Sequence, residues 1–191
     1  MTTVLNLPLQ QANPETIRDL QERFPSANLR VEVKKKTLAN VLTEQGFWRI
    51  IDLFDWTDSE DDDRVLEQAV TALAASPIHH IYLFSDMLAA KLSSLDGKIF
   101  AENIGDDAYS PNKYFSVDNF LYARCCVIAN GEKFYESVLK NPTLMPKDLT
   151  FESLLSLASK SYLKKTNKSY DYISVTPIET YSNKAGWQKS V

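Results

Sequence analysis

The sequence predicts an α+β fold, predominantly helical, in which about six helices form one core beside a small two- or three-stranded sheet. Three observations lead to this prediction. Apolar residues recur at helical spacing through most of residues 43–166. Residues 29–33 alternate between apolar and charged side chains, which is typical of a half-buried strand. Hydrophobic residues make up 44% of the 191-residue chain, which is enough for a core without disulfides or metals.

Residues 1–36 are expected to form a strand–helix–strand element. A short apolar segment, Val4–Leu9, supplies the first strand. Asn13 and Pro14 are typical of a helix start, because asparagine caps a helix and proline suits its first position. The alternating strand at 29–33 follows, and the residues leave the direction of strand pairing open.

Residues 43–191 are expected to form a mainly helical domain that makes one compact unit with the amino-terminal element. Its helices are placed, in order, from Thr43, around Val65–Leu73, from Ser76 to Gly97, from Ser116 to Gly131, from Phe134 to Asn141, and from Asp148 or Thr150 to Tyr162. The segment 172–176 is expected to be either a late strand or an extended packing segment. The residues after Ser182 are expected to be weakly ordered apart from Trp187.

Several motifs between Phe47 and Pro142 resemble those of a known family. They are Phe47-Trp48-Arg49-Ile50-Ile51-Asp52, Phe84 inside a helix led by two histidines, Ser116-Val117-Asp118-Asn119-Phe120, Arg124, Gly131, Phe134-Tyr135 and Pro142. In this order they resemble the bacterial domain-of-unknown-function family numbered 4240. The resemblance implies a mostly helical bacterial domain. It implies no activity, so it assigns no catalytic residue.

The charge and the cysteines favour a cytoplasmic protein. Lys and Arg number 21 against 25 Asp and Glu, a net charge of −4, which opposes general nucleic-acid binding despite the lysine triplet at 34–36. No stretch is long and apolar enough to span a membrane, and no secretory signal opens the chain. Cys125 and Cys126 are adjacent, so they are expected to be reduced and buried in a helix.

The motifs of the common enzyme classes are absent from the sequence. It contains no phosphate-binding glycine loop, no nucleophile elbow and no HExxH. The adjacent His79 and His80 do not converge on one metal, and the acidic run lacks the glycine of a calcium loop. We therefore expect no cofactor and no metal, and we favour a non-enzymatic protein.

The first functional hypothesis is a non-enzymatic protein-interaction module that binds a basic protein, for example as an immunity or antitoxin-type partner. Seven acids occur in the twelve residues 52–63, and two tryptophans lie near them. Acidic surfaces steer basic partners, and aromatic side chains anchor interfaces. The partner-binding candidates are Trp48, Asp55, Trp56, Asp58, Glu60, Asp61, Asp62 and Asp63. Part of this acidity also suits helix caps.

The alternative is a small-ligand or nucleotide sensor, or an enzyme without a recognised motif. It uses Tyr109 and Tyr114 from the polar loop 105–116, together with Arg124 on the following helix. Arg124 falls close to the apolar stripe of that helix, so we expect it to be at least half buried and to need an acceptor. The acceptors considered are Asp52, Asp106 and Asp107. A purely structural interpretation of the same residues is that Arg124 is a core residue that links the loop to the helix.

Overall fold

A computed structural model describes residues 14–25, 41–58 and 61–188, and the chain divides into two units between Ala39 and Asn40. In the first unit the described element is α1 (Pro14–Arg23), which begins at the predicted proline. Its Arg23 lies 3.3 Å from Asp19, one helical turn earlier. The strands expected near 3–9 and 29–33 lie outside the described residues.

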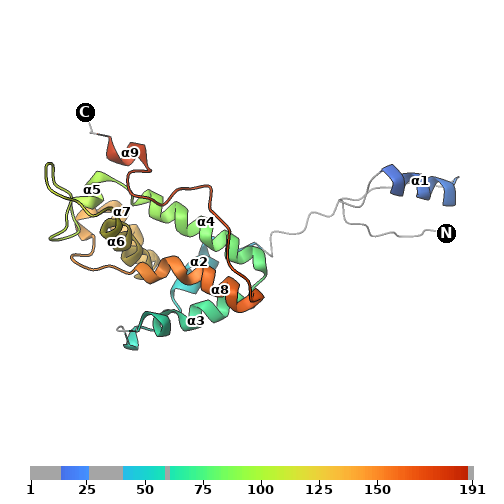
Figure 1. Cartoon of the computed structure of the whole chain (residues 1–191), viewed down its shortest axis with the longest axis horizontal. Coiled ribbons are helices and arrows are strands. Elements are labelled where there is room, and N and C mark those ends of the chain that lie inside the picture. Colours follow the sequence, from blue (N-terminus) through green and yellow to red (C-terminus); the bar gives the residue numbers. More distant parts are fainter. Residues whose placement is uncertain (1–13, 26–40, 59–60, 189–191) are drawn as a thin grey trace. The chain divides into compact units, whose positions relative to one another are not determined.

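The second unit is helical. In order it contains α2 (Glu44–Ile51), the 3-10 helix η3 (Trp56–Asp58), α3 (Asp62–Ala75), α4 (Ile78–Ser94), α5 (Lys98–Ala101), α6 (Val117–Ala129), α7 (Glu132–Lys140), the 3-10 helices η4 (Pro142–Leu144) and η5 (Glu152–Ser156), α8 (Leu157–Thr166) and α9 (Lys184–Trp187). Figure 1 shows this order. None of these helices is long and apolar enough to cross a bilayer.

The predicted small sheet is wrong, because the described residues contain no strand. The segment 172–176 is irregular and lies against a helix. The hydroxyl groups of Tyr170 and Tyr172 meet Ser85 and Asp86 of α4 at 2.6 and 2.7 Å. Side-chain bonds to α4 therefore take the place of a ladder between strands, and the α+β prediction is corrected to a helical fold.

Polar side chains cap the starts of α2, α3 and α6. The Thr43 hydroxyl accepts from the N–H of Gly46 at 3.1 Å, and the Ser116 hydroxyl accepts from that of Asn119 at 3.2 Å. Asp61 caps α3, which agrees with the expectation that part of the acidity at 52–63 suits helix caps. Such caps are worth about 1 kcal/mol each, so they fix where these helices begin.

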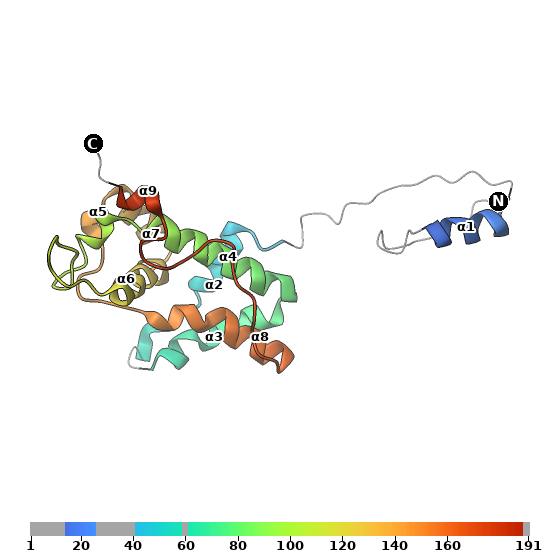
Figure 2. The same cartoon turned by 45° about the horizontal axis from the view of Figure 1, so that its top comes forward.

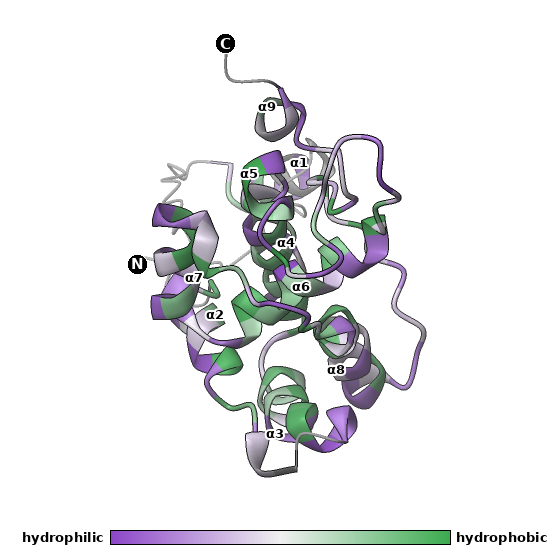
Figure 3. Cartoon of the chain, turned by 90° about the vertical axis from the view of Figure 1, so that its left-hand side faces the viewer, coloured by the Kyte–Doolittle hydropathy of each residue, from purple (hydrophilic) through white to green (hydrophobic). Residues whose placement is uncertain are grey.

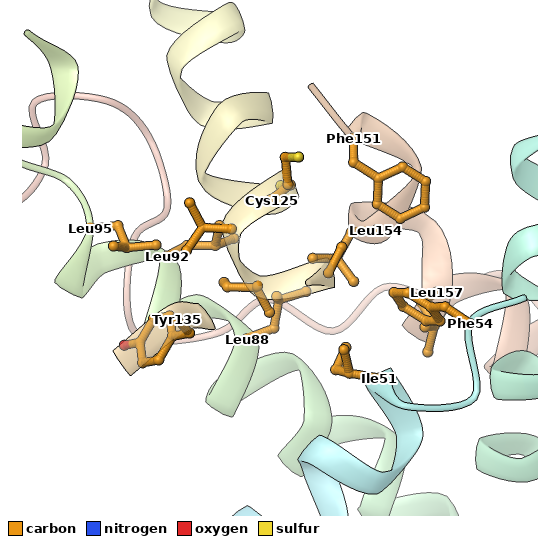
Figure 4. Packing of buried hydrophobic residues seen from close by; sticks show 14 of the residues in the cluster. Ile51, Phe54, Leu88, Leu92, Leu95, Cys125, Tyr135, Phe151, Leu154 and Leu157 are labelled. Atoms are coloured by element: carbon orange, nitrogen blue, oxygen red, sulfur yellow. The ribbon is translucent and has the colours of Figure 1, made fainter. Parts of the chain in front are cut away.

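The core lies where α2, α3, α4, α6 and α8 meet. Phe47, Phe84 and Phe120 are fully buried there, and the first two stack with ring centroids 4.8 Å apart. Figure 4 shows buried side chains of α2, α4 and α8 gathered together, among them Ile51, Leu88 and Leu157. Figure 3 shows hydrophobic residues on the inward sides of the helices and hydrophilic residues on the outer side of α7.

A glycine makes the turn between α6 and α7. Gly131 has φ of +88°, a conformation that costs glycine little and other residues more. The predicted helix end at Gly131 is therefore confirmed, since α6 ends at Ala129 and α7 begins at Glu132.

After α8 the chain crosses α4 and ends in α9 beside α5. Figures 1 and 2 both show this dark-red path. We call its last part, residues 177–188, the strap. Before the strap, Ile173 and Val175 turn outward and are 86% and 95% exposed. The strap therefore joins parts of the unit that lie far apart in sequence.

Candidate functional site

Two charged side chains are fully buried at one end of the helical unit. Asp96 follows the end of α4, and Arg124 lies in the middle of α6. Burying a charge is expensive unless hydrogen bonds or an opposite charge compensate it. The groups that bind these two buried charges are therefore the first place to look for a functional site.

The guanidinium of Arg124 is bound by neutral oxygens. Its Nη1 donates to the Leu92 carbonyl at 3.0 Å, and its Nη2 donates to the Ile178 carbonyl and the Thr180 hydroxyl, each at 3.0 Å. Its Cζ lies 4.8 Å from the centre of the Phe120 ring. The burial expected from the apolar stripe of α6 is confirmed.

The expected carboxylate partners of Arg124 are wrong. Asp52 is exposed, the N–H of Asp106 is bound by the Asp148 side chain, and Asp107 accepts from Asn119 at 2.7 Å. Arg124 points instead at the Leu92 carbonyl in the last turn of α4, the end of the helix that carries partial negative charge. Burial lowers the pKa of Arg124, and the negative charge of Asp96 opposes that shift.

The carboxylate of Asp96 is bound by the strap. The backbone N–H groups of Tyr181 and Asn183 donate to it at 3.2 and 2.8 Å. The Ser182 hydroxyl donates at 3.3 Å, and the indole N–H of Trp187 donates at 2.7 Å. Asp96 was not singled out from the sequence, which placed it in the last turn of the helix expected up to Gly97. Trp187 was expected to be ordered, but not as a partner of Asp96.

An aromatic cluster covers this pair of charges. The Trp187 ring lies 5.5 Å from Tyr109, 5.9 Å from Phe120 and 4.3 Å from Tyr181, measured between ring centroids. The structure thus brings Tyr109 of the predicted loop close to the site of Arg124. Tyr114 is 88% exposed and takes no part in the cluster.

A cavity of about 510 Å³ adjoins the strap at Asp96. Its lining includes Lys98 and Glu102 together with Asn183 and Gly186 of the strap. Its wall therefore carries both signs of charge next to polar groups of the strap.

The sequence profile of a family described as a protein of unknown function, DUF4240, matches residues 42–164. The chain belongs to the DUF4240 family. No curated protein and no solved structure matches the chain. Asp96 and Arg124 both lie inside the residues matched to DUF4240, whereas the strap lies beyond them.

The acidic aromatic candidate divides into buried and exposed parts. Trp48 is only 3% exposed, so its indole faces the interior of the DUF4240 domain and not a partner. Trp56 is 46% exposed and packs with Phe54 and Phe151 at 6.0 and 5.1 Å between ring centroids. One indole of the predicted pair therefore remains on the surface.

Most acids of this candidate have structural bonds. Asp55 accepts from both the N–H and the hydroxyl of Thr57, and these bonds lower its pKa. Asp62 accepts from the Ser153 hydroxyl at 2.5 Å. Asp63 is exposed and forms an ion pair with Lys160.

Two of the remaining acids lie at helix ends. Asp61 caps α3, accepting from the N–H groups of Asp63 and Arg64 at 3.1 and 3.2 Å. Asp58 ends η3, and Glu60 lies outside the described residues. Within the described ranges, no group of three or more His, Cys, Asp or Glu side chains is arranged to hold a metal ion.

An ammonium group lies inside an aromatic cage that was not predicted. The Nζ of Lys91 lies 4.6 Å from the Trp48 ring, 5.0 Å from Tyr135 and 5.5 Å from Phe47. The same Nζ is 2.5 Å from a carboxylate oxygen of Glu44, and this bond lowers the pKa of Glu44. The cage explains why Trp48 is buried.

Replacing Lys91 with methionine is expected to lower the free energy of unfolding at pH 7 by about 1–2 kcal/mol, because the cation–π contacts are lost. Urea denaturation followed by circular dichroism measures the change. Lys98→Met is the matched control, since Lys98 pairs with Glu102 at 3.5 Å, and such an exposed pair contributes about 0.5 kcal/mol. Equal losses in both variants would contradict the role of the cage.

Cys125 and Cys126 are free and buried. Burial raises the pKa of Cys125 to about 12 and also raises that of Cys126. At pH 8 a thiol-reactive chromogenic reagent is therefore expected to react very slowly with the folded chain and rapidly with two thiols after denaturation. Rapid reaction of either thiol in the folded chain would contradict this expectation.

Proposed function

We propose that this DUF4240 protein is a non-enzymatic protein-interaction module that binds a basic protein, in the manner of an immunity or antitoxin-type partner. The carrying observation is that Asp61, Asp62 and Asp63 are all exposed at the start of α3, near the half-exposed Trp56. Trp56 packs on Phe151, and Asp62 bonds to Ser153, so both lie against the same short segment.

The chemistry of this surface suits a basic protein. An indole offers a large rigid contact area, and neighbouring carboxylates accelerate encounter with a positively charged surface. Acidic side chains are favoured at this helix start, because the positive end of the α3 dipole lies there. We place the module in a reducing compartment such as the cytoplasm, which the free cysteines support.

The ligand-sensor alternative has less support. Arg124 is fully buried, and the oxygens bound to its Nη1 and Nη2 come from the chain itself. A small carboxylate or phosphate would have to displace these bonds. We therefore assign Arg124 no ligand in the closed state described here.

Affinity capture from a lysate of the source organism tests the proposal. The baits are the wild-type chain, Trp56→Ala, and the double variant Asp62→Asn/Asp63→Asn. The control is Glu132→Gln/Glu136→Gln, which removes the same charge from the exposed side of α7. We expect a basic protein with the wild type and the control, and at least about tenfold less of it with both site variants.

Binding of the captured protein is also expected to weaken as salt is raised, because the attraction between the two surfaces is electrostatic. Equal capture by all four baits, or capture of an acidic partner alone, would contradict the proposal. Circular dichroism of each bait shows whether a loss of capture reflects lost folding.

A further inference from the structure

We propose that Arg124 and Asp96 form a recognition site for an extended peptide, which the strap of the same chain fills. When the strap is displaced, the site takes an extended segment of a partner protein with the chemistry of the strap. This site uses different residues from the acidic surface around Trp56, so the proposal is independent of the proposed function.

The strap binds the two charges through three main-chain groups and three side-chain groups. A carbonyl of Ile178 accepts from Arg124, and the N–H groups of Tyr181 and Asn183 donate to Asp96. Any extended peptide carries such groups, which is why main-chain bonds give affinity in peptide recognition while side chains give selectivity. The partner segment is therefore expected to carry a hydroxyl residue and, further along, a tryptophan, as Thr180 and Trp187 do here.

Within the DUF4240 domain, Asp96 and Arg124 obtain most of their hydrogen-bond partners from whatever occupies the site. Among the described residues, the bonds to the Asp96 carboxylate all come from the strap, and those to Arg124 Nη2 do so as well. The exception is the Leu92 carbonyl at Nη1. Because a buried charge without partners is strongly unfavourable, this site can close only over an occupant that supplies matching groups.

The fit of the strap is close at one point. A Cβ atom added to Gly186 would lie 2.4 Å from the Asp96 carbonyl oxygen and 3.0 Å from the Cα of Gly97. These are backbone atoms, so the strap cannot keep its present approach to the domain once a Cβ atom is added. Gly186→Ala is therefore expected to loosen the strap, and it replaces neither Arg124 nor Asp96.

A peptide-binding experiment on the full chain tests the proposal. The probe is a fluorescein-labelled synthetic peptide of residues 177–188, and its fluorescence anisotropy is measured with the wild type and with Gly186→Ala. We expect Gly186→Ala to bind the probe at least about tenfold more tightly, since its own strap competes less. Ala185→Ser, at the exposed neighbouring residue, is the matched control and is expected to behave as the wild type.

The probe itself is varied to test recognition. A peptide in which Trp187 is replaced by alanine loses the indole bond to Asp96 and is expected to bind Gly186→Ala at least about tenfold less tightly. A folded Gly186→Ala chain that binds neither peptide, or binds both equally, overturns the proposal.

Hydrogen exchange on the wild type decides the matter if Gly186→Ala does not fold. The backbone amides of Tyr181 and Asn183 are expected to exchange at least about tenfold faster than the central amides of α4, through opening of the strap alone. If these amides exchange only as slowly as α4, the strap leaves only when the whole domain unfolds. That result overturns the proposal.

Discussion

Replacing Arg124 with alanine is expected to lower the free energy of unfolding by about 3–5 kcal/mol. The change empties a fully buried volume, removes the donor of the Ile178 carbonyl, and takes one of its two donors from the Leu92 carbonyl. It also removes the positive charge whose attraction to the buried carboxylate of Asp96 offsets part of the cost of burying both groups. Urea denaturation followed by circular dichroism measures the loss.

The control is Arg124→Lys, which keeps the charge. A single ammonium cannot reach both Leu92 and the strap with the geometry of a guanidinium, so we expect only partial rescue. A melting temperature unchanged by Arg124→Ala would contradict the structural role and would favour Arg124 as a ligand-binding residue.

Replacing Asp96 with asparagine is expected to cost about 2–4 kcal/mol, although the two side chains have nearly the same shape. The carboxylate accepts from the strap on both oxygens, whereas an amide accepts on one and presents N–H groups on the other. The N–H groups of the asparagine side chain would therefore face N–H donors of the strap inside the core. The strap is expected to detach first, which hydrogen exchange at Asn183 measures.

Asp107→Asn is the matched control for this change. Asp107 is exposed and accepts a bond from the Asn119 side chain, so its neutralisation is expected to change stability by less than about 1 kcal/mol. Equal effects of Asp96→Asn and Asp107→Asn would contradict the central place that the structure gives to Asp96.

The helices could be predicted from the sequence, because caps and apolar spacing are local signals. Ser116 caps α6 as expected, and α4 follows Pro77 as expected. The sheet could not be decided in the same way. The sequence leaves the segment 172–176 open between a strand and an extended packing segment, and its neighbour in the structure is α4 and not a strand.

The candidate site was only half predictable. The burial of Arg124 follows from its position beside the apolar stripe of α6, but its strap acceptors come from Ile178 and Thr180, which lie 54 and 56 residues further on. Trp48 was expected on the surface, because α2 has one clear apolar side. Lys91 and Tyr135 cover the other side, and no spacing within α2 reveals them.

The distance along the chain between Asp96 and its partners also affects how the protein is made. During synthesis Asp96 leaves the ribosome 91 residues ahead of Trp187, and Arg124 leaves 54 residues ahead of Ile178. Until the strap emerges, both charges are more stable in water than in a closed core. This end of the nascent domain is therefore held open, and it closes after translation has passed the strap, as contacts between distant residues require.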